Sequence, residues 1–319
     1  MDIDSETKVY RFVNFFDLYK LVTNKKLRMS KLSIMEDKNE GLGRILESQE
    51  SDLFLRVHCI ESEEIKKYHN GIIHNTYVSC WTKEADMVAM WSLYSVDKTG
   101  IRIRTSAKKL LSALERFFTA HHWSEYDELS NKNQFLADRY DVCQVKYVDF
   151  YGLRDEIRRK YQNFDKLARE KSSLNSFYFE DENGYKQDYE KLQRHKIIQI
   201  EGWALKDRAY QHEQEIRGLL FCGIRSNRTI EEYSEDPLKS LVHWADAEVL
   251  PNFIYLDIED DFIEEICFDP RCPNYKIEVY MDILKNYLKN YSISIVKSRA
   301  FGYALEESFA SDIDGYPRE

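Results

Sequence analysis

The most constraining feature of this sequence is a strand pattern followed at once by a helix pattern, three times before residue 120. The strand patterns are KVYRFV (8–13), NTYVSCWT (75–82) and IRIRTS (101–106), which are rich in β-branched and aromatic residues. The helix patterns are NFFDLYKLV, EADMVAMWSLYS and AKKLLSALERFF, in which apolar residues recur at helical spacing. Asn14 is placed to cap the first of these helices. Because strands and helices alternate in this way, the sequence predicts an α+β fold with one core.

The second half of the chain continues this pattern around a charged stretch. The strand patterns there are CQVKYVDF, IRGLLF, FIYLDI, IEEICFD, SISIVKS and FGYALEE, and YKIEVYMDILKNYLKNY predicts a last helix. GWALK predicts a helix that ends near Lys206. Residues from Gly152 to Ile200 are dense in both charges and have helical spacing, which is typical of a solvated helical insertion. The predicted organisation is one domain over residues 1–319, with an insertion at about 152–200.

Composition excludes several classes of protein. The net charge of −10, from 46 basic and 56 acidic residues, argues against a general nucleic-acid coat, because non-specific affinity for phosphate comes from Lys and Arg. The six cysteines form no CxxC pair and no HExxH occurs, so no metal site is expected. The cysteines are expected to be reduced thiols, although Cys267 and Cys272 could bridge in an oxidising compartment. The acidic start of the chain and the absence of a long apolar run predict a cytoplasmic protein without a membrane span.

Among chemical motifs, a pair of carboxylates is the main candidate. The sequence has no GxGxxG, no GxxxxGK[ST] and no GxSxG, so nucleotide-loop and nucleophile-elbow signatures are missing. In YQHEQEIRGLLF, Glu213 and Glu215 stand two apart at a predicted strand start, where both would point to one face. Held in a cleft, such carboxylates can bind a sugar hydroxyl and stabilise positive charge on an anomeric carbon. The alternative is a solvated strand end, which is the usual role of this pattern.

Arg11 and Ser79 are candidate ligands of a phosphorylated sugar. Arg11 is a charged residue within an otherwise apolar strand, and its planar guanidinium suits a diphosphate. Ser79 stands in the strand TYVS and can hydrogen-bond a ribose. Tyr10, Trp81 and Tyr94 lie near these residues in the sequence and could hold a flat ring, although aromatic side chains at such positions more often belong to the core.

The order of these features resembles two known families. SCW…MWSLYS…GIRI, the acidic EDKNEG and the later HEQEIR resemble a large bacterial domain family of unknown function, across nearly the whole chain. VYRFVNFFDLYKLVTNKKLRMS is similar to the opening of the ADP-ribosyltransferase superfamily, in particular its branch of DNA- and RNA-modifying toxins. In that superfamily an Arg or His, a Ser or Tyr, and a Glu build the NAD site. Arg11, Ser79 and Glu215 stand here in that order, with Glu213 before Glu215, although Gln211 and Glu213 also fit.

This resemblance implies a split, mixed or antiparallel sheet and an NAD-dependent ADP-ribosyltransferase. Arg11 would hold the diphosphate or the adenosine-side ribose, Ser79 and the aromatic side chains the nicotinamide half, Glu215 the ribose, and Glu213 the acceptor. Arg11 and Glu215 are expected to meet across one cleft. The motif VSCW departs from the Ser-Thr-Ser of the family, which weakens the assignment of Ser79.

The implied setting is a bacterial toxin or antiviral defence effector that modifies nucleic acid. RNA or DNA is favoured over protein as acceptor, and an antitoxin or regulatory protein is a possible partner. Two alternatives stay open. One is an NAD glycohydrolase, in which water is the acceptor, or a protein-directed transferase. The other is a non-catalytic recognition domain with solvated carboxylates.

Overall fold

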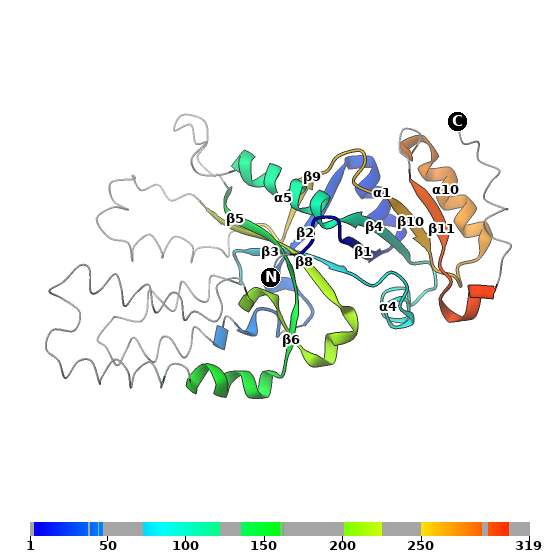
Figure 1. Cartoon of the computed structure of the whole chain (residues 1–319). Coiled ribbons are helices and arrows are strands. Elements are labelled where there is room, and N and C mark those ends of the chain that lie inside the picture. The colour runs from blue at the N-terminus through cyan, green and yellow to red at the C-terminus, as the bar shows by residue number, and fades with distance from the viewer. Residues whose placement is uncertain are drawn as a thin grey trace, which may run out of the picture.

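In the described part of the chain, nine strands form one mixed sheet that carries the fold (Figure 1). The computed structural model describes residues 3–37, 39–43, 45–46, 73–121, 135–159, 162, 201–224, 250–288 and 293–305. The strand order is β11-β10-β4-β1-β3-β2-β9, and the sheet extends further because β8 pairs with β3 and β5 with β8. All pairs in this sheet are antiparallel except β10 with β11. The predicted α+β class is confirmed as a mixed sheet with several helices.

The strands fall largely where the alternating patterns predict them. They are β1 (Lys8–Val13), β2 (Lys26–Lys31), β3 (Thr76–Thr82), β4 (Ile101–Ser106), β5 (Phe135–Gln144), β8 (Glu215–Ile224), β9 (Phe253–Asp257), β10 (Glu265–Phe268) and β11 (Ser294–Lys297). Two short parallel strands, β6 (Lys146–Val148) and β7 (Leu205–Asp207), form a separate sheet. The predicted strand CQVKYVDF is therefore divided between β5 and β6.

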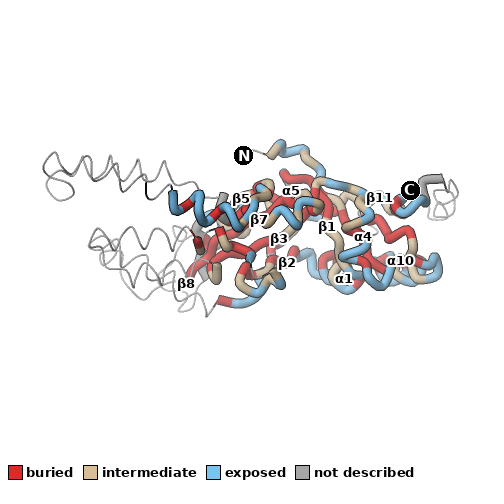
Figure 2. The backbone as a smooth tube through the Cα atoms, turned by 90° about the horizontal axis from the view of Figure 1, so that it is seen from below, coloured by how far each residue is buried: buried red, intermediate tan, exposed pale blue. Residues whose placement is uncertain are grey.

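The helices cover the sheet and close its core. They are α1 (Phe15–Asn24), α4 (Val88–Tyr94), α5 (Ala107–His121) and α10 (Asn274–Leu288). Asn14 caps α1 as predicted, because its side-chain oxygen accepts a hydrogen bond from the Asp17 backbone N–H at 2.8 Å. The apolar faces of α1, α5 and α10 pack into one large core with the sheet, and their outer faces remain exposed (Figure 2).

The sheet forks beside β3, because one edge of β3 pairs with two different strands, β1 and β2. The opposite edge of β3 pairs with β8 over the whole strand. On the first edge, β2 pairs with Tyr77 and Val78, whereas β1 pairs only with Thr82. Strands β1 and β2 therefore diverge, and Ser79 and Trp81 lie between the two points of pairing.

Two sequence predictions fail in this part of the structure. The stretch predicted as a helix ending near Lys206 forms a 3-10 turn, η3 (Glu201–Ala204), followed by β7. Residues 301–305 of the predicted closing strand FGYALEE instead belong to the 3-10 segment η6 (Ala300–Leu305), and the last two lie outside the described residues. Phe301 and Gly302 have positive φ values of 57° and 89°, which an extended strand does not accommodate. In both places the spacing of apolar residues predicted the wrong element, because that spacing does not report the backbone conformation of each residue.

The remaining predictions concern the insertion, the cysteines and the membrane. Of the predicted insertion, residues 152–159 belong to a helix at 150–159, and nearly all of the rest lies outside the described residues. Cys267 and Cys272 are both free thiols. No helix in the described ranges is long and apolar enough to cross a membrane. Within those ranges, no group of His, Cys, Asp and Glu is arranged to hold a metal ion.

Candidate functional site

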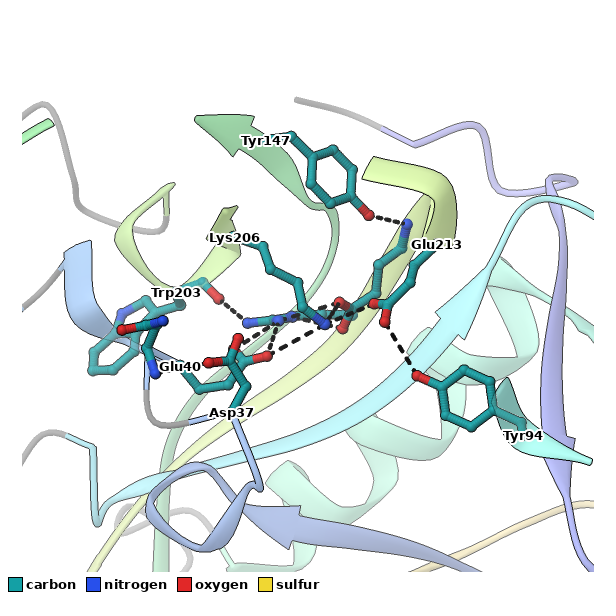
Figure 3. Close-up of polar contacts among 10 residues, drawn as sticks. Asp37, Glu40, Tyr94, Tyr147, Trp203, Lys206 and Glu213 are labelled. Carbon is teal, nitrogen blue, oxygen red and sulfur yellow. Dashed lines mark hydrogen bonds and ion pairs between the residues drawn. The ribbon is translucent and has the colours of Figure 1, made fainter. Parts of the chain in front are cut away.

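A buried network of five charged side chains lies at the start of β8 (Figure 3). Its members are three carboxylates and two cations: Glu40, Glu213, Glu215, Lys206 and Arg217. Arg217 is fully buried, and the side chains of Glu40 and Glu215 are each only 3% exposed. Charged groups buried to this degree are stable only when they are paired and hydrogen-bonded.

Arg217 ties two of the carboxylates together. Its Nε donates to Glu215 Oε1 at 2.7 Å, and one terminal nitrogen donates to Glu40 at 2.9 Å. The other terminal nitrogen donates to the backbone oxygen of Trp203 at 2.8 Å. The guanidinium therefore joins β8, η3 and the turn that contains Glu40, which are far apart in the sequence.

Lys206 connects all three carboxylates. Its Nζ donates to Glu213 Oε2 at 2.6 Å and to Glu215 Oε2 at 3.2 Å, and it lies 3.5 Å from Glu40 Oε1. The side chain reaches these groups from β7, where a helix had been predicted. The two glutamates converge on one ammonium group, which removes most of the repulsion expected between them.

Glu213 and Glu215 converge although they do not share a strand. Glu213 ends the 3-10 segment η4 (Arg208–Glu213), and Glu215 begins β8. Gln214 between them has a left-handed backbone, with φ of 43° and ψ of 48°. The prediction that both carboxylates begin one strand is therefore wrong, because Gln214 interrupts the alternation. Each carboxylate is brought to Lys206 by its own element.

The electrostatics of the network differ from one carboxylate to the next. Burial alone would raise the pKa of Glu215, but Arg217 and Lys206 outweigh it and lower that pKa to about 2. Burial raises the pKa of Glu40, and Arg217 only partly offsets it. With every member ionised, three negative charges face two positive ones. In that state the network has a surplus of one negative charge, which the raised pKa of Glu40 opposes.

Three tyrosine side chains contact the network. Tyr94 donates from its hydroxyl to Glu213 Oε1 at 3.2 Å, and half of its side chain remains exposed. Tyr147 approaches from another side and its hydroxyl accepts from the Glu215 backbone N–H at 2.8 Å (Figure 3). The ring of Tyr210 lies 4.6 Å from the Lys206 ammonium. Glu213 is thus the carboxylate nearest to an accessible aromatic surface.

Helix α4 fixes the position of Tyr94. Trp91, which is completely buried, donates from Nε1 to Asp86 at 2.9 Å. Arg271 donates to the backbone oxygens of Trp91 and Ser95 at the end of the helix, at 3.2 and 3.4 Å. These contacts satisfy the carbonyl groups that a helix end leaves free and hold Tyr94 over Glu213.

A second polar cluster lies at the fork between β1 and β2. Arg11 donates to Ser79 Oγ at 2.9 Å and to the Arg28 backbone oxygen at 3.4 Å. Trp81 donates from its indole N–H to the same Ser79 oxygen at 2.9 Å, and the Arg11 guanidinium lies 5.9 Å from the Trp81 ring. The structure therefore brings together three of the predicted ligands, Arg11, Ser79 and Trp81.

The two clusters occupy opposite faces of the sheet. Ser79 is opposite Gly218 and Thr82 is opposite Glu215 in the β3–β8 register, and side chains alternate between faces along each strand. Ser79, Trp81 and Arg11 therefore point to one face. Glu215 points to the other face. The expectation that Arg11 and Glu215 meet across one cleft is wrong, because Thr82, the partner of Glu215, is three positions from Ser79, and an odd offset along a strand changes the face.

The predicted aromatic ligands divide between the two faces. Tyr10 is paired with Thr82 and so lies on the face of Glu215, where its ring contacts the Arg102 guanidinium at 5.0 Å. Tyr94 joins the carboxylates as described. Trp81 is only 3% exposed and packs edge-on against Phe262, so its ring belongs to the core.

Sequence reasoning missed three members of the network, namely Glu40, Lys206 and Arg217. Glu40 and Arg217 lie within EDKNEG and HEQEIR, the two charged motifs that carry the resemblance to the family of unknown function. Arg217 also interrupts an apolar strand, as Arg11 does. A charged residue within a buried strand was a usable signal at both positions, whereas nothing local marks Lys206.

Part of the chain, less than half of it, matches the model of one protein family. Residues 90–218 match the family described as "Protein of unknown function (DUF2971)". The match confirms the resemblance to an uncharacterised domain family and includes Lys206, Glu213, Glu215 and Arg217. It does not extend to Arg11 or Glu40. No curated protein and no solved structure matches the chain.

Proposed function

We propose that the protein is an enzyme that transfers ADP-ribose from NAD, and that Glu213 is the carboxylate that contacts the donor. The observation that carries this proposal is that three carboxylates face two cations, and that Glu213, the least buried of the three at 8% exposed, bonds to the half-exposed Tyr94. The forked sheet is a fold-level feature in keeping with the resemblance to ADP-ribosyltransferases. That resemblance is the second support.

The chemistry of NAD fits a carboxylate beside an aromatic ring. The nicotinamide ring of NAD is cationic, and a negative site lined by tyrosine attracts such a ring. When the bond between the ribose C1′ and the ring nitrogen breaks, its electron pair leaves with nicotinamide and positive charge develops on the ribose. Glu213 would stabilise that charge, while Lys206 holds the carboxylate in place. The acceptor atom then bonds to C1′ and loses its proton.

Glu215 has a positioning role in this proposal. Its carboxylate is held between Arg217 and Lys206 and is almost completely buried, so it is not available to a substrate. It fixes Lys206, which in turn orients Glu213. Arg11 and Ser79 have no part in this site, because they point to the other face of the sheet.

For the acceptor, we propose nucleic acid, RNA or DNA, in preference to protein. This follows the resemblance to the nucleic-acid-modifying branch, which also suggests a toxin or antiviral defence effector restrained by an antitoxin or regulatory protein. The net charge of −10 opposes binding of a polyanion, so a local basic surface is needed. Arg158 and Arg159 are exposed on the helix at 150–159 and are candidates for it.

The test is nicotinamide release from NAD by purified protein, with cellular RNA, DNA and protein offered as acceptors. Glu213→Gln should reduce the rate at least about a hundredfold, because it removes the charge that stabilises the transition state. Tyr94→Phe, which keeps the ring, should reduce it less. Glu84→Gln, an exposed carboxylate just beyond β3, is the matched control and should leave the rate unchanged. Full turnover in a folded Glu213→Gln variant would refute the assignment.

Two other functions are distinguished by the same experiment. An NAD glycohydrolase gives free ADP-ribose and no modified macromolecule, which mass spectrometry separates. A non-catalytic recognition domain is favoured by the complete pairing of Glu40, Glu215 and Arg217, which is also what a structural ion network requires. That function predicts no nicotinamide release and no effect of NAD on thermal stability.

A further inference from the structure

Arg11 carries a charge that no carboxylate in the described part of the chain neutralises. Its hydrogen bonds go to the neutral oxygens of Ser79 and of the Arg28 backbone. The guanidinium is partly buried at the fork of the sheet, where β1 and β2 separate. Burial of a cation without a counter-ion is unfavourable, so a site of this kind attracts an anion.

Arg28 increases the positive charge at the same place. Its guanidinium lies 3.5 Å from Asp17 and stacks on the exposed Phe253 ring at 5.2 Å. Among the described residues, Asp17 is therefore the one carboxylate that pairs with either of these two neighbouring arginines. Burial lowers the pKa of Arg11, Arg28 lowers it further, and Asp17 opposes both effects. The two arginines together with Asp17 have a net charge of +1.

The planar guanidinium has a geometry that suits one class of ligand. Its parallel N–H groups match two oxygens of a phosphoryl group, and such charge-assisted hydrogen bonds are stronger than neutral ones. One terminal nitrogen of Arg11 donates to Ser79 and to the Arg28 backbone, and no hydrogen bond of its other donors is found among the described residues. Arg28 is 41% exposed and can turn toward a bound anion.

From this arrangement we propose that Arg11 and Arg28 form a binding site for the phosphoryl group of a small molecule, at the fork between β1 and β2. The site is separate from the carboxylate network, because it opens on the opposite face of β3. It goes beyond the proposed function and does not depend on it. At this site a small ligand fits better than a nucleic acid, because two arginines offset by Asp17 leave a net charge of only +1, and binding of a polyanion needs many cationic contacts.

The test measures thermal stability against phosphate at constant ionic strength. Increasing orthophosphate should raise the midpoint of unfolding along a saturating curve, since a ligand that binds only the folded state stabilises it. Arg11→Met should weaken the apparent phosphate affinity about ten- to hundredfold, the value of one or two charge-assisted hydrogen bonds. The same titration with ADP distinguishes a nucleotide ligand from free phosphate. The ligand class is the one whose titration saturates at the lower concentration.

Three control variants separate this site from general charge effects. Arg116→Met removes an arginine paired with Glu259 and should leave the phosphate response unchanged. Glu213→Gln on the other face should also keep it, while Arg11→Met should keep nicotinamide release. If Arg11→Met does not fold, Arg28→Met, at an exposed position, should still weaken the response. A phosphate effect that is absent, or equal in the wild type, Arg11→Met and Arg28→Met, would overturn the proposal.

Discussion

Arg217 is the residue whose replacement tests the structure of the charged network most directly. Arg217→Met removes the ion pairs at 2.7 Å to both Glu215 and Glu40, together with the bond to the Trp203 carbonyl at 2.8 Å. Two buried carboxylates then share Lys206 with Glu213. Removing one partner of a buried ion pair typically costs about 3–5 kcal/mol, because it leaves an uncompensated buried charge. We expect a loss of that size in the free energy of unfolding at pH 7.

The assay is urea unfolding followed by tryptophan fluorescence, with Arg116→Met as the control for a partly exposed pair. That control should cost less than about 1 kcal/mol. Adding Glu40→Gln to Arg217→Met should recover at least about 1 kcal/mol, since one buried charge fewer is left without a partner. The loss of unfolding free energy caused by Arg217→Met should also be smaller at pH 5, where a carboxylate without its cation takes up a proton more readily. Equal losses in Arg217→Met and Arg116→Met, or simple additivity of the double variant, would refute the reasoning.

Two further predictions concern acid stability and a close contact. Glu215 has a folded pKa of about 2 against an ordinary value of 4.5, so its contribution of about 3 kcal/mol is present above pH 4.5 and is lost as the pH falls toward 2. Glu215→Gln should remove this loss of unfolding free energy between pH 4.5 and 2, as measured by denaturation at a series of pH values. An unchanged pH dependence in that range would contradict the prediction. Gly100→Ala should destabilise by about 1–3 kcal/mol, because its Cβ would lie 2.6 Å from Ser95 Cβ. Gly152→Ala, where the new Cβ meets nothing within 4 Å in the helix at 150–159, should be neutral or stabilising, and calorimetry compares the two.

The candidate site shows where reasoning from sequence succeeds and where it stops. The charged motif HEQEIR stands out before an apolar strand, which drew attention to Glu213 and Glu215, and the structure places Tyr94 against Glu213. Of the ordered set Arg11, Ser79 and Glu215, the first two meet, together with Trp81, and Glu215 does not join them. The sequence could not show that these are two clusters. The register of β3 against β8 decides which face each side chain occupies, and register depends on pairing between distant segments.

The sequence by itself determined the local elements of this protein. Strand alternation and helical spacing are short-range properties of neighbouring residues, so β1, α1, β3, β4 and α5 fall where the patterns predict them, with Asn14 as the cap of α1. Only the tertiary structure decided which charges neutralise one another. Glu40 and Arg217 are 177 positions apart, yet they form one ion pair in the core. Burial makes this pairing necessary, because the desolvation free energy of a buried charge is offset only when the fold brings an opposite charge into contact with it.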